Sequence, residues 1–126
     1  MTTTANSVLA GLRLLVVEDE FLIAEHIEEE LKGFGFDVAG PVATIKEALA
    51  AVKEGGLHGV LLDANLHGES SAPVAEELLR ALVPFVVVTG YGGRELADDT
   101  LNGAPRLIKP FSTPELEATL IAAFIH

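Results

Sequence analysis

Six side chains that can bind a metal ion or take part in catalysis stand at, or just after, the ends of short apolar runs. They are Glu18, Asp19, Asp63, Asn65, Thr89 and Lys109. Asp63 is the clearest case, because the apolar run Gly59–Leu62 before it and Gly68 after it are typical of a buried strand that ends in a turn. Taken alone, an aspartate at such a place is as typical of a turn or a helix cap as of a functional site.

The six side chains become informative together, because ligands of open α/β sheets bind where the carboxyl ends of the strands meet. Three carboxylates at one sheet edge repel one another unless a cation neutralises them. Mg²⁺ is bound by oxygen ligands, takes few carboxylates and keeps several waters, which leaves room for a phosphoryl oxygen. The pattern therefore predicts a magnesium site that can hold a phosphoryl group.

Lys109, Thr89 and Asp63 supply the other groups that phosphoryl chemistry requires. Lys109 offers a positive point charge to the phosphoryl oxygens, and the Thr89 hydroxyl can donate a hydrogen bond to them. Asp63, between the metal and the lysine, is then placed as a nucleophile for in-line attack on phosphorus. We expect an aspartyl phosphate to form at this site.

Five apolar stretches predict the strands that would bring these side chains together. The stretches are Leu12–Val17, Phe36–Ala39, Gly59–Leu62, Phe85–Val88 and Arg106–Ile108. Gly40-Pro41 is expected to end the second of them. The stretches alternate with helical segments of about 10–15 residues, which predicts one α/β domain with a parallel sheet and helices on both faces.

The helical segments carry start signals and apolar faces. Thr113 is expected to cap the last helix, just ahead of a proline in its first turn. The apolar faces of two helices are expected to bury Leu79 and Ile121. Residues 94–101 form the weakest helix candidate, because glycines flank them and they contain poor helix formers.

The composition limits the classes of protein to which the chain can belong. Its 126 residues suit one domain with one core, and residues 1–10 are mostly small and polar, as in a flexible tail. The formal net charge of -11 argues against a nucleic-acid partner, and the absence of cysteine excludes disulfides and thiolate metal sites. We find no signal peptide and no apolar run of membrane-spanning length, so we expect a cytoplasmic protein without a membrane partner.

Four short motifs, in this order, resemble the response-regulator receiver domains of two-component signalling, and the likeness runs from Leu12 to Phe124. The motifs are Val17-Glu18-Asp19-Glu20, Leu62-Asp63-Ala64-Asn65, Val88-Thr89 and Lys109-Pro110-Phe111. The resemblance implies the flavodoxin-like (βα)5 fold, a three-layer sandwich whose parallel five-stranded sheet has the order 2-1-3-4-5. Residues 11–126 would form the receiver domain.

The resemblance also implies the function of a stand-alone receiver. Asp63 would accept a phosphoryl group from a histidine kinase or a histidine phosphotransfer protein, and Thr89 would be the switch hydroxyl. The signal would leave through a downstream protein partner or by onward transfer of the phosphoryl group. The partner surface would include the loops of Thr89 and Lys109, with Pro110 and Phe111. Apart from its own phosphorylation and dephosphorylation, the chain would not be an enzyme.

The metal ligands follow from the same resemblance. Mg²⁺ would be held directly by Asp19, by Asp63 and by the backbone carbonyl of Asn65, while Glu18 would act through water. The peptide bond before Pro110 is typically cis in the family, and cis bonds are largely confined to proline.

Two features depart from the common family pattern. Arg106 stands in the fifth strand where many receivers have an aromatic side chain whose rotation follows that of the switch hydroxyl. The stretch Pro84–Tyr91 resembles the FAT-GUY subgroup of single-domain receivers, with Val88 in place of the subgroup's alanine and the phenylalanine displaced. We expect Tyr91 and residues 92–103 to carry the switch in place of a rotating aromatic.

Two other functions fit parts of the pattern. A degenerate receiver would serve as a scaffold without phosphorylation. A phosphohydrolase with an aspartyl-phosphate intermediate, as in haloacid-dehalogenase-like enzymes, would need a second aspartate as general acid at the position of Asn65. His67 lies near Asp63 in the sequence but is expected to be an exposed loop residue, and no pair of histidines has the spacing of a zinc site.

Overall fold

The computed structural model describes residues 11–90, 101 and 103–125 of the chain. Its strands are β1 (Arg13–Val17), β2 (Asp37–Val42), β3 (Gly59–Asp63), β4 (Asn65–Leu66), β5 (Glu69–Ser70), β6 (Phe85–Thr89) and β7 (Arg106–Ile108). Its helices are α2 (Phe21–Gly33), α3 (Ile45–Glu54), α4 (Ala72–Arg80) and α6 (Thr113–Phe124). Within these ranges, no helix is both long and apolar enough to cross a membrane.

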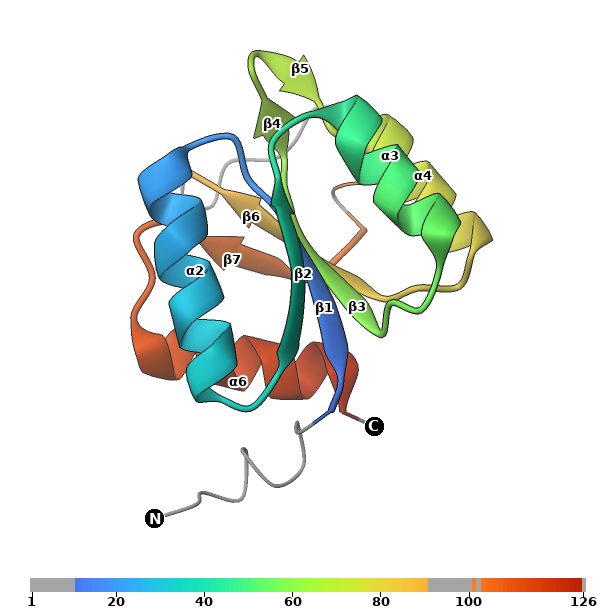
Figure 1. The fold of residues 1–126 in the computed structure, drawn as a ribbon. Coiled ribbons are helices and arrows are strands. Elements are labelled where there is room, and N and C mark those ends of the chain that lie inside the picture. Colours follow the sequence, from blue (N-terminus) through green and yellow to red (C-terminus); the bar gives the residue numbers. More distant parts are fainter. Residues whose placement is uncertain (1–10, 91–100, 102, 126) are drawn as a thin grey trace.

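One parallel sheet with the strand order β2-β1-β3-β6-β7 forms the middle layer (Figure 1). Helices α2 and α6 lie on one face of the sheet, and α3 and α4 lie on the other. Since β6 and β7 are the fourth and fifth strands of this sheet along the chain, the predicted order 2-1-3-4-5 and the flavodoxin-like fold are confirmed. The order reverses between β1 and β3, which places their carboxyl ends side by side at the point where such folds bind ligands.

The strands are apolar on both faces because both faces are covered. In β1, Leu15 and Val17 pack into the core under α3 and α4, whereas Leu14 and Val16 pack into the core under α2 and α6. The same alternation continues in β3 and β6. A continuous apolar run of this kind is typical of a buried parallel strand. The polar residues therefore come where each strand leaves the core.

The second strand is longer than predicted. β2 runs on to Val42, so the expectation that Gly40-Pro41 ends it is wrong. Its register against β1 shifts between Leu15 and Val17, and β2 lies at the edge of the sheet. An edge strand with a bulge can hold a proline, which has no N–H to donate to the ladder.

Two expectations about helix faces are also wrong. Leu79 and Ile121 are 56% and 37% exposed, respectively. The buried stripe of α4 includes Leu78, and the next residue along a helix points about 100° away from it. The buried stripe of α6 includes Leu120, and Ile121 is turned away from the core in the same manner.

The last helix begins one residue earlier than predicted. Ser112 is the N-cap of α6 and forms a full capping box with Glu115, while the predicted cap Thr113 is already helical. Two further expectations, the tail over residues 1–10 and the helix over residues 94–101, fall outside the described residues except for Leu101.

A small antiparallel hairpin after β3 was not predicted. Strands β4 and β5 pair Asn65 with Ser70 and Leu66 with Glu69. The two residues between them, His67 and Gly68, have φ values of 52° and 83°. Positive φ at both central positions is the geometry of a two-residue hairpin turn that matches the twist of its strands. This hairpin holds the loop after Asp63 close to the sheet edge.

Candidate functional site

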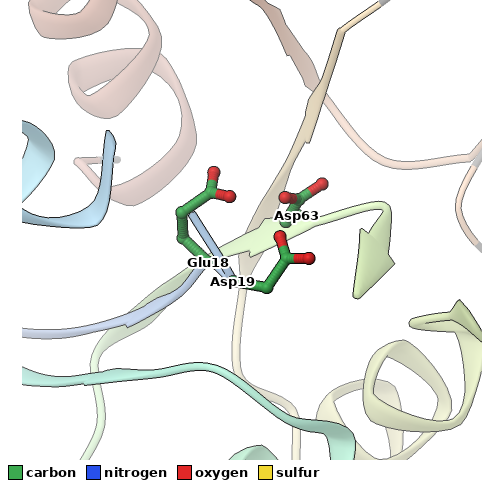
Figure 2. A group of neighbouring side chains, drawn as sticks. All are labelled: Glu18, Asp19 and Asp63. Atoms are coloured by element: carbon green, nitrogen blue, oxygen red, sulfur yellow. The ribbon is translucent and has the colours of Figure 1, made fainter. Parts of the chain in front are cut away.

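Three acidic side chains meet at the carboxyl ends of β1 and β3 (Figure 2). Glu18 and Asp19 follow β1, and Asp63 is the last residue of β3. These strands are neighbours with Val17 opposite Leu62, so the residues that follow them lie side by side. One carboxylate oxygen of each acidic residue lies within 4.8 Å of the others. Glu18 and Asp63 are buried, whereas Asp19 is partly exposed.

The ammonium group of Lys109 faces the two buried carboxylates. Its Nζ lies 2.9 Å from Oε1 of Glu18 and 3.4 Å from Oδ2 of Asp63. The sheet brings the lysine to this place, because β7 pairs with β6 and the Lys109 N–H donates to the carbonyl oxygen of Thr89 at 2.8 Å. The Lys109-Pro110 peptide bond is cis, as the resemblance implied. One positive charge thus stands among several negative ones.

The charges of this group shift the proton affinities of its members. Burial raises the pKa of Asp63 to about 7, and the adjacent Glu18 carboxylate adds to the rise, while the charge of Lys109 opposes it. Burial by itself favours the neutral amine of Lys109, but the carboxylates of Glu18 and Asp63 outweigh it and raise the pKa of the ammonium group. Lys109 therefore stays charged near neutral pH, whereas Asp63 is a carboxyl group that a further cation would ionise.

The hairpin after Asp63 folds back over the acidic residues. The Asn65 N–H donates to Oδ1 of Asp63 at 3.2 Å, and the His67 N–H donates to Oδ2 of Asp19 at 2.9 Å. Burial opposes ionisation of Asp19, but the hydrogen bond from His67 helps to outweigh it and the pKa of Asp19 lies below its usual value. The His67 side chain is exposed, as predicted. The hydrogen bond from the His67 N–H to Asp19 was not predicted from the sequence. Gly68 was the residue that could have indicated the tight turn which makes this contact possible.

Thr89 and Arg106 come from neighbouring strands near the same edge. Thr89 is buried at the end of β6, one residue beyond Val88, which pairs with Asp63. Arg106 begins β7 opposite Val87 and is partly buried. The structure thus brings Thr89 to the level of the acidic cluster and leaves Arg106 two residues further from it. No aromatic side chain occupies the Arg106 position.

Pro110 and Phe111 directly follow Lys109 in the chain. They help to form an open cavity of about 560 Å³ lined by Leu22, Ile23, His26, Gly90, Lys109, Pro110 and Phe111. Phe111 also packs against the core under α2 and α6. Tyr91 falls outside the described residues, as do residues 92–100 and 102, so the predicted switch segment stays a prediction.

The acidic cluster fits a hard divalent cation. Each of Glu18, Asp19 and Asp63 offers a carboxylate oxygen, and the ligand atoms are close enough to share one ion. Oxygen ligands in this number leave room for waters, as Mg²⁺ prefers. The pKa of Asp63 is raised mainly by burial, with a further rise from the adjacent Glu18 carboxylate, and a bound cation would favour the ionised carboxylate.

Solved structures similar to this chain are response-regulator receivers. SdrG of Sphingomonas melonis Fr1 is 40% identical, with 88% of this chain and 94% of that chain covered and a TM-score of 0.78. The receiver domain of the Erythrobacter litoralis PhyR response regulator is 30% identical, with 90% and 89% covered and a TM-score of 0.79. No protein-family model matches the chain.

Curated relatives extend beyond the matched region. The phyllosphere-induced regulator PhyR of Methylorubrum extorquens is 32% identical over 113 residues, which are 87% of this chain and 42% of that protein. The chain spans about half the length of the curated relatives that it matches.

Proposed function

The chain belongs to the response-regulator receiver domains, and we propose that it accepts a phosphoryl group on Asp63 from a histidine kinase or a histidine phosphotransfer protein. The observation that carries this proposal is the position of Asp63. Its carboxylate is buried at the end of β3, with Glu18 and Asp19 on one side and the Lys109 ammonium 3.4 Å from Oδ2.

The proposed step is an in-line displacement at phosphorus. An Asp63 carboxylate oxygen forms the new bond to phosphorus as the bond from phosphorus to the donor's imidazole nitrogen breaks, and that nitrogen keeps the electron pair. Lys109 stands where it can neutralise charge on the phosphoryl oxygens. We infer that the Thr89 hydroxyl, one residue beyond the strand partner of Asp63, donates a hydrogen bond to the product. When the other ring nitrogen of the donor histidine carries a proton, the reaction leaves an acyl phosphate and a neutral imidazole.

A divalent ion is part of the proposal. Mg²⁺ would be held by Asp19, by Asp63 and by the backbone carbonyl of Asn65, with Glu18 reached through water. When bound, the ion supplies positive charge to the carboxylates and to a phosphoryl oxygen. Asp63 then ionises below its metal-free pKa of about 7, so the nucleophile is available at neutral pH.

The donor protein is proposed to dock beside Lys109. Leu22 is 76% exposed at the start of α2, and it shares the open cavity of about 560 Å³ with Pro110 and Phe111. Phe21, the preceding residue, is 74% exposed. Exposed apolar side chains grouped around a polar site mark a protein contact surface. A partner seated there would bring its phosphohistidine to the mouth of the Asp63 site.

The output of the chain is proposed to be a change of surface that a downstream protein reads, or onward transfer of the phosphoryl group. The relative SdrG has a BeF3-activated conformation. A phosphoryl group adds charge and acceptor oxygens at a strand end, and partner surfaces respond to such changes. Membership of the FAT-GUY subgroup, a cytoplasmic location, and a switch carried by Tyr91 and residues 92–103 are also part of this proposal. The net charge of -11 supports a protein rather than a nucleic-acid partner.

Intact-mass analysis tests the proposed function. The protein is incubated with acetyl phosphate and Mg²⁺, beside the variant Asp63→Asn and a sample with chelator. We expect the mass of one phosphoryl group on the wild type, and no addition in the variant or without Mg²⁺. If a folded wild type gains no phosphoryl group from acetyl phosphate or from a kinase, the receiver is a scaffold and the proposal is wrong.

A further inference from the structure

Glu20 lies beside the phosphorylation site but has no role in the proposed reaction. It is the N-cap residue of α2, yet its side chain makes no capping hydrogen bond. Its own N–H donates to Oε2 of Glu18 at 3.1 Å, which holds the backbone in place. Its carboxylate instead turns toward Lys109, with Oε1 3.8 Å from Nζ. The Glu20 carboxylate therefore lies near the Lys109 ammonium group and does not cap the helix.

Lys109 is shared among three carboxylates that differ in exposure. An ammonium group has three N–H donors and no acceptor. Glu18 and Asp63 approach Nζ to 2.9 and 3.4 Å, and their side chains are only 1% and 9% exposed. Glu20 is 65% exposed and lies beyond hydrogen-bond distance. It is thus the most exposed of the three carboxylates around Lys109, and it precedes Phe21 and Leu22 of the proposed docking surface.

We propose that Glu20 determines donor specificity, by placing a negative charge beside Lys109 that disfavours small, freely diffusing anionic phosphodonors. An incoming phosphoryl group and the Glu20 carboxylate compete for the same face of the ammonium group. The Glu20 carboxylate repels a negatively charged donor as it approaches Lys109, so the repulsion grows with the negative charge of the donor. A docked protein donor gains binding energy from its other contacts, whereas a small anion has none to offset the repulsion.

This inference rests on the proposed function, because it concerns donors for Asp63. It requires no strong ion pair between Glu20 and Lys109. Exposed pairs of this kind contribute little to stability. A fixed charge beside the site nevertheless changes the encounter with a charged ligand, and that effect weakens as salt is added.

The test compares Glu20→Gln with the wild type and with Glu29→Gln. Glu29 is exposed on the same helix, so its variant has the same net charge but keeps the charge beside Lys109. Phosphorylation rates are measured by mass spectrometry against the concentration of acetyl phosphate and, separately, of phosphoramidate, which carries less negative charge. We expect Glu20→Gln to raise the second-order rate constant for acetyl phosphate about 3- to 5-fold at low salt, with a smaller gain for phosphoramidate.

Two further readouts separate specificity from a general change in the site. The gain with acetyl phosphate should shrink as ionic strength rises, and Glu29→Gln should behave as the wild type. Equal gains for the two donors, or no gain in Glu20→Gln, would overturn the inference while leaving the wild type a working receiver. Failure of the wild type to become phosphorylated would instead overturn the proposed function.

Discussion

Lys109 and Glu18 form an ion pair of 2.9 Å in which the carboxylate side chain is 1% exposed and the lysine side chain 17% exposed. Burying two charges costs desolvation free energy that their attraction only partly repays. The pair is thus poor as a stabilising device but costly to break, because removing one member leaves the other buried and uncompensated. Asp63 lies beside the same ammonium group, so loss of Lys109 would leave a second buried carboxylate without its cation.

Replacing Lys109 with methionine should destabilise the metal-free protein. We expect Lys109→Met to lower the free energy of unfolding by about 2–3 kcal/mol, because Glu18 and Asp63 would then face each other without a cation. Urea denaturation at neutral pH with chelator measures the change. The matched control is Lys32→Met, which removes a lysine from the surface pair with Glu28 and should cost less than about 0.5 kcal/mol. Equal losses in the two variants would contradict the dependence on Lys109.

Asp63 should make the metal-free protein less stable as pH rises. Its pKa is about 7 in the folded chain and 3.8 in its usual state, so the folded chain holds a proton that the unfolded chain has released between these values. A group with a raised pKa contributes stability that is full at low pH and is lost as pH rises toward 7. The lowered pKa values of Asp19, Glu47 and Glu115 act in the opposite direction, since their contribution is lost as pH falls.

The variant Asp63→Asn isolates the contribution of this one carboxyl group. We expect the stability of Asp63→Asn relative to the wild type to increase by roughly 2 kcal/mol between about pH 4 and pH 7, less than the full pKa difference because solvent screens part of the interaction. Urea denaturation in chelator over this range gives the two curves. If the stabilities of the two proteins change with pH in parallel, the pKa of Asp63 is not raised by its buried surroundings.

The chemical groups of the site were predictable from the sequence because they stand where apolar runs end. Asp19 and Lys109 follow strands and Asp63 ends one, and parallel strands bring their ends together whatever the detail of packing. The role of Glu20, the third carboxylate at Lys109, was not predictable, since its residue type is equally typical of the start of a helix. Only the direction of its side chain, toward Nζ of Lys109, separates the two roles.

Local competition between neighbouring residues explains most of the other differences. Ser112 and Thr113 are both good N-cap residues, and the sequence pattern does not rank two adjacent hydroxyls. The structure uses Ser112 because Glu115 lies three residues further on and completes the capping box, while Thr113 donates to Glu30 of α2. The length of β2 depended on its place at the sheet edge, which is a property of the whole fold and not of Gly40-Pro41.

Substitution of the two hydroxyl residues should show which one caps α6. We expect Ser112→Ala to lower the free energy of unfolding by about 1 kcal/mol, because the Glu115 N–H loses its acceptor at the helix start. Thr113→Ala should cost less, since it removes only an exposed hydrogen bond to Glu30. Thermal and urea unfolding of both variants measure the difference. A larger loss in Thr113→Ala would show that the cap is assigned to the wrong residue.

Magnesium should stabilise the folded chain through the acidic cluster. A ligand that binds only the folded state at ten times its dissociation constant adds about 1.4 kcal/mol to the free energy of unfolding. Asp19→Asn should abolish this gain, because the amide carries no charge for the ion, while it can still accept the hydrogen bond from the His67 N–H. Asp37→Asn is the control, since Asp37 lies at the start of β2, away from the cluster, in an exposed pair with Arg13. The assignment of Asp19 as a metal ligand is wrong if magnesium stabilises Asp19→Asn as much as Asp37→Asn.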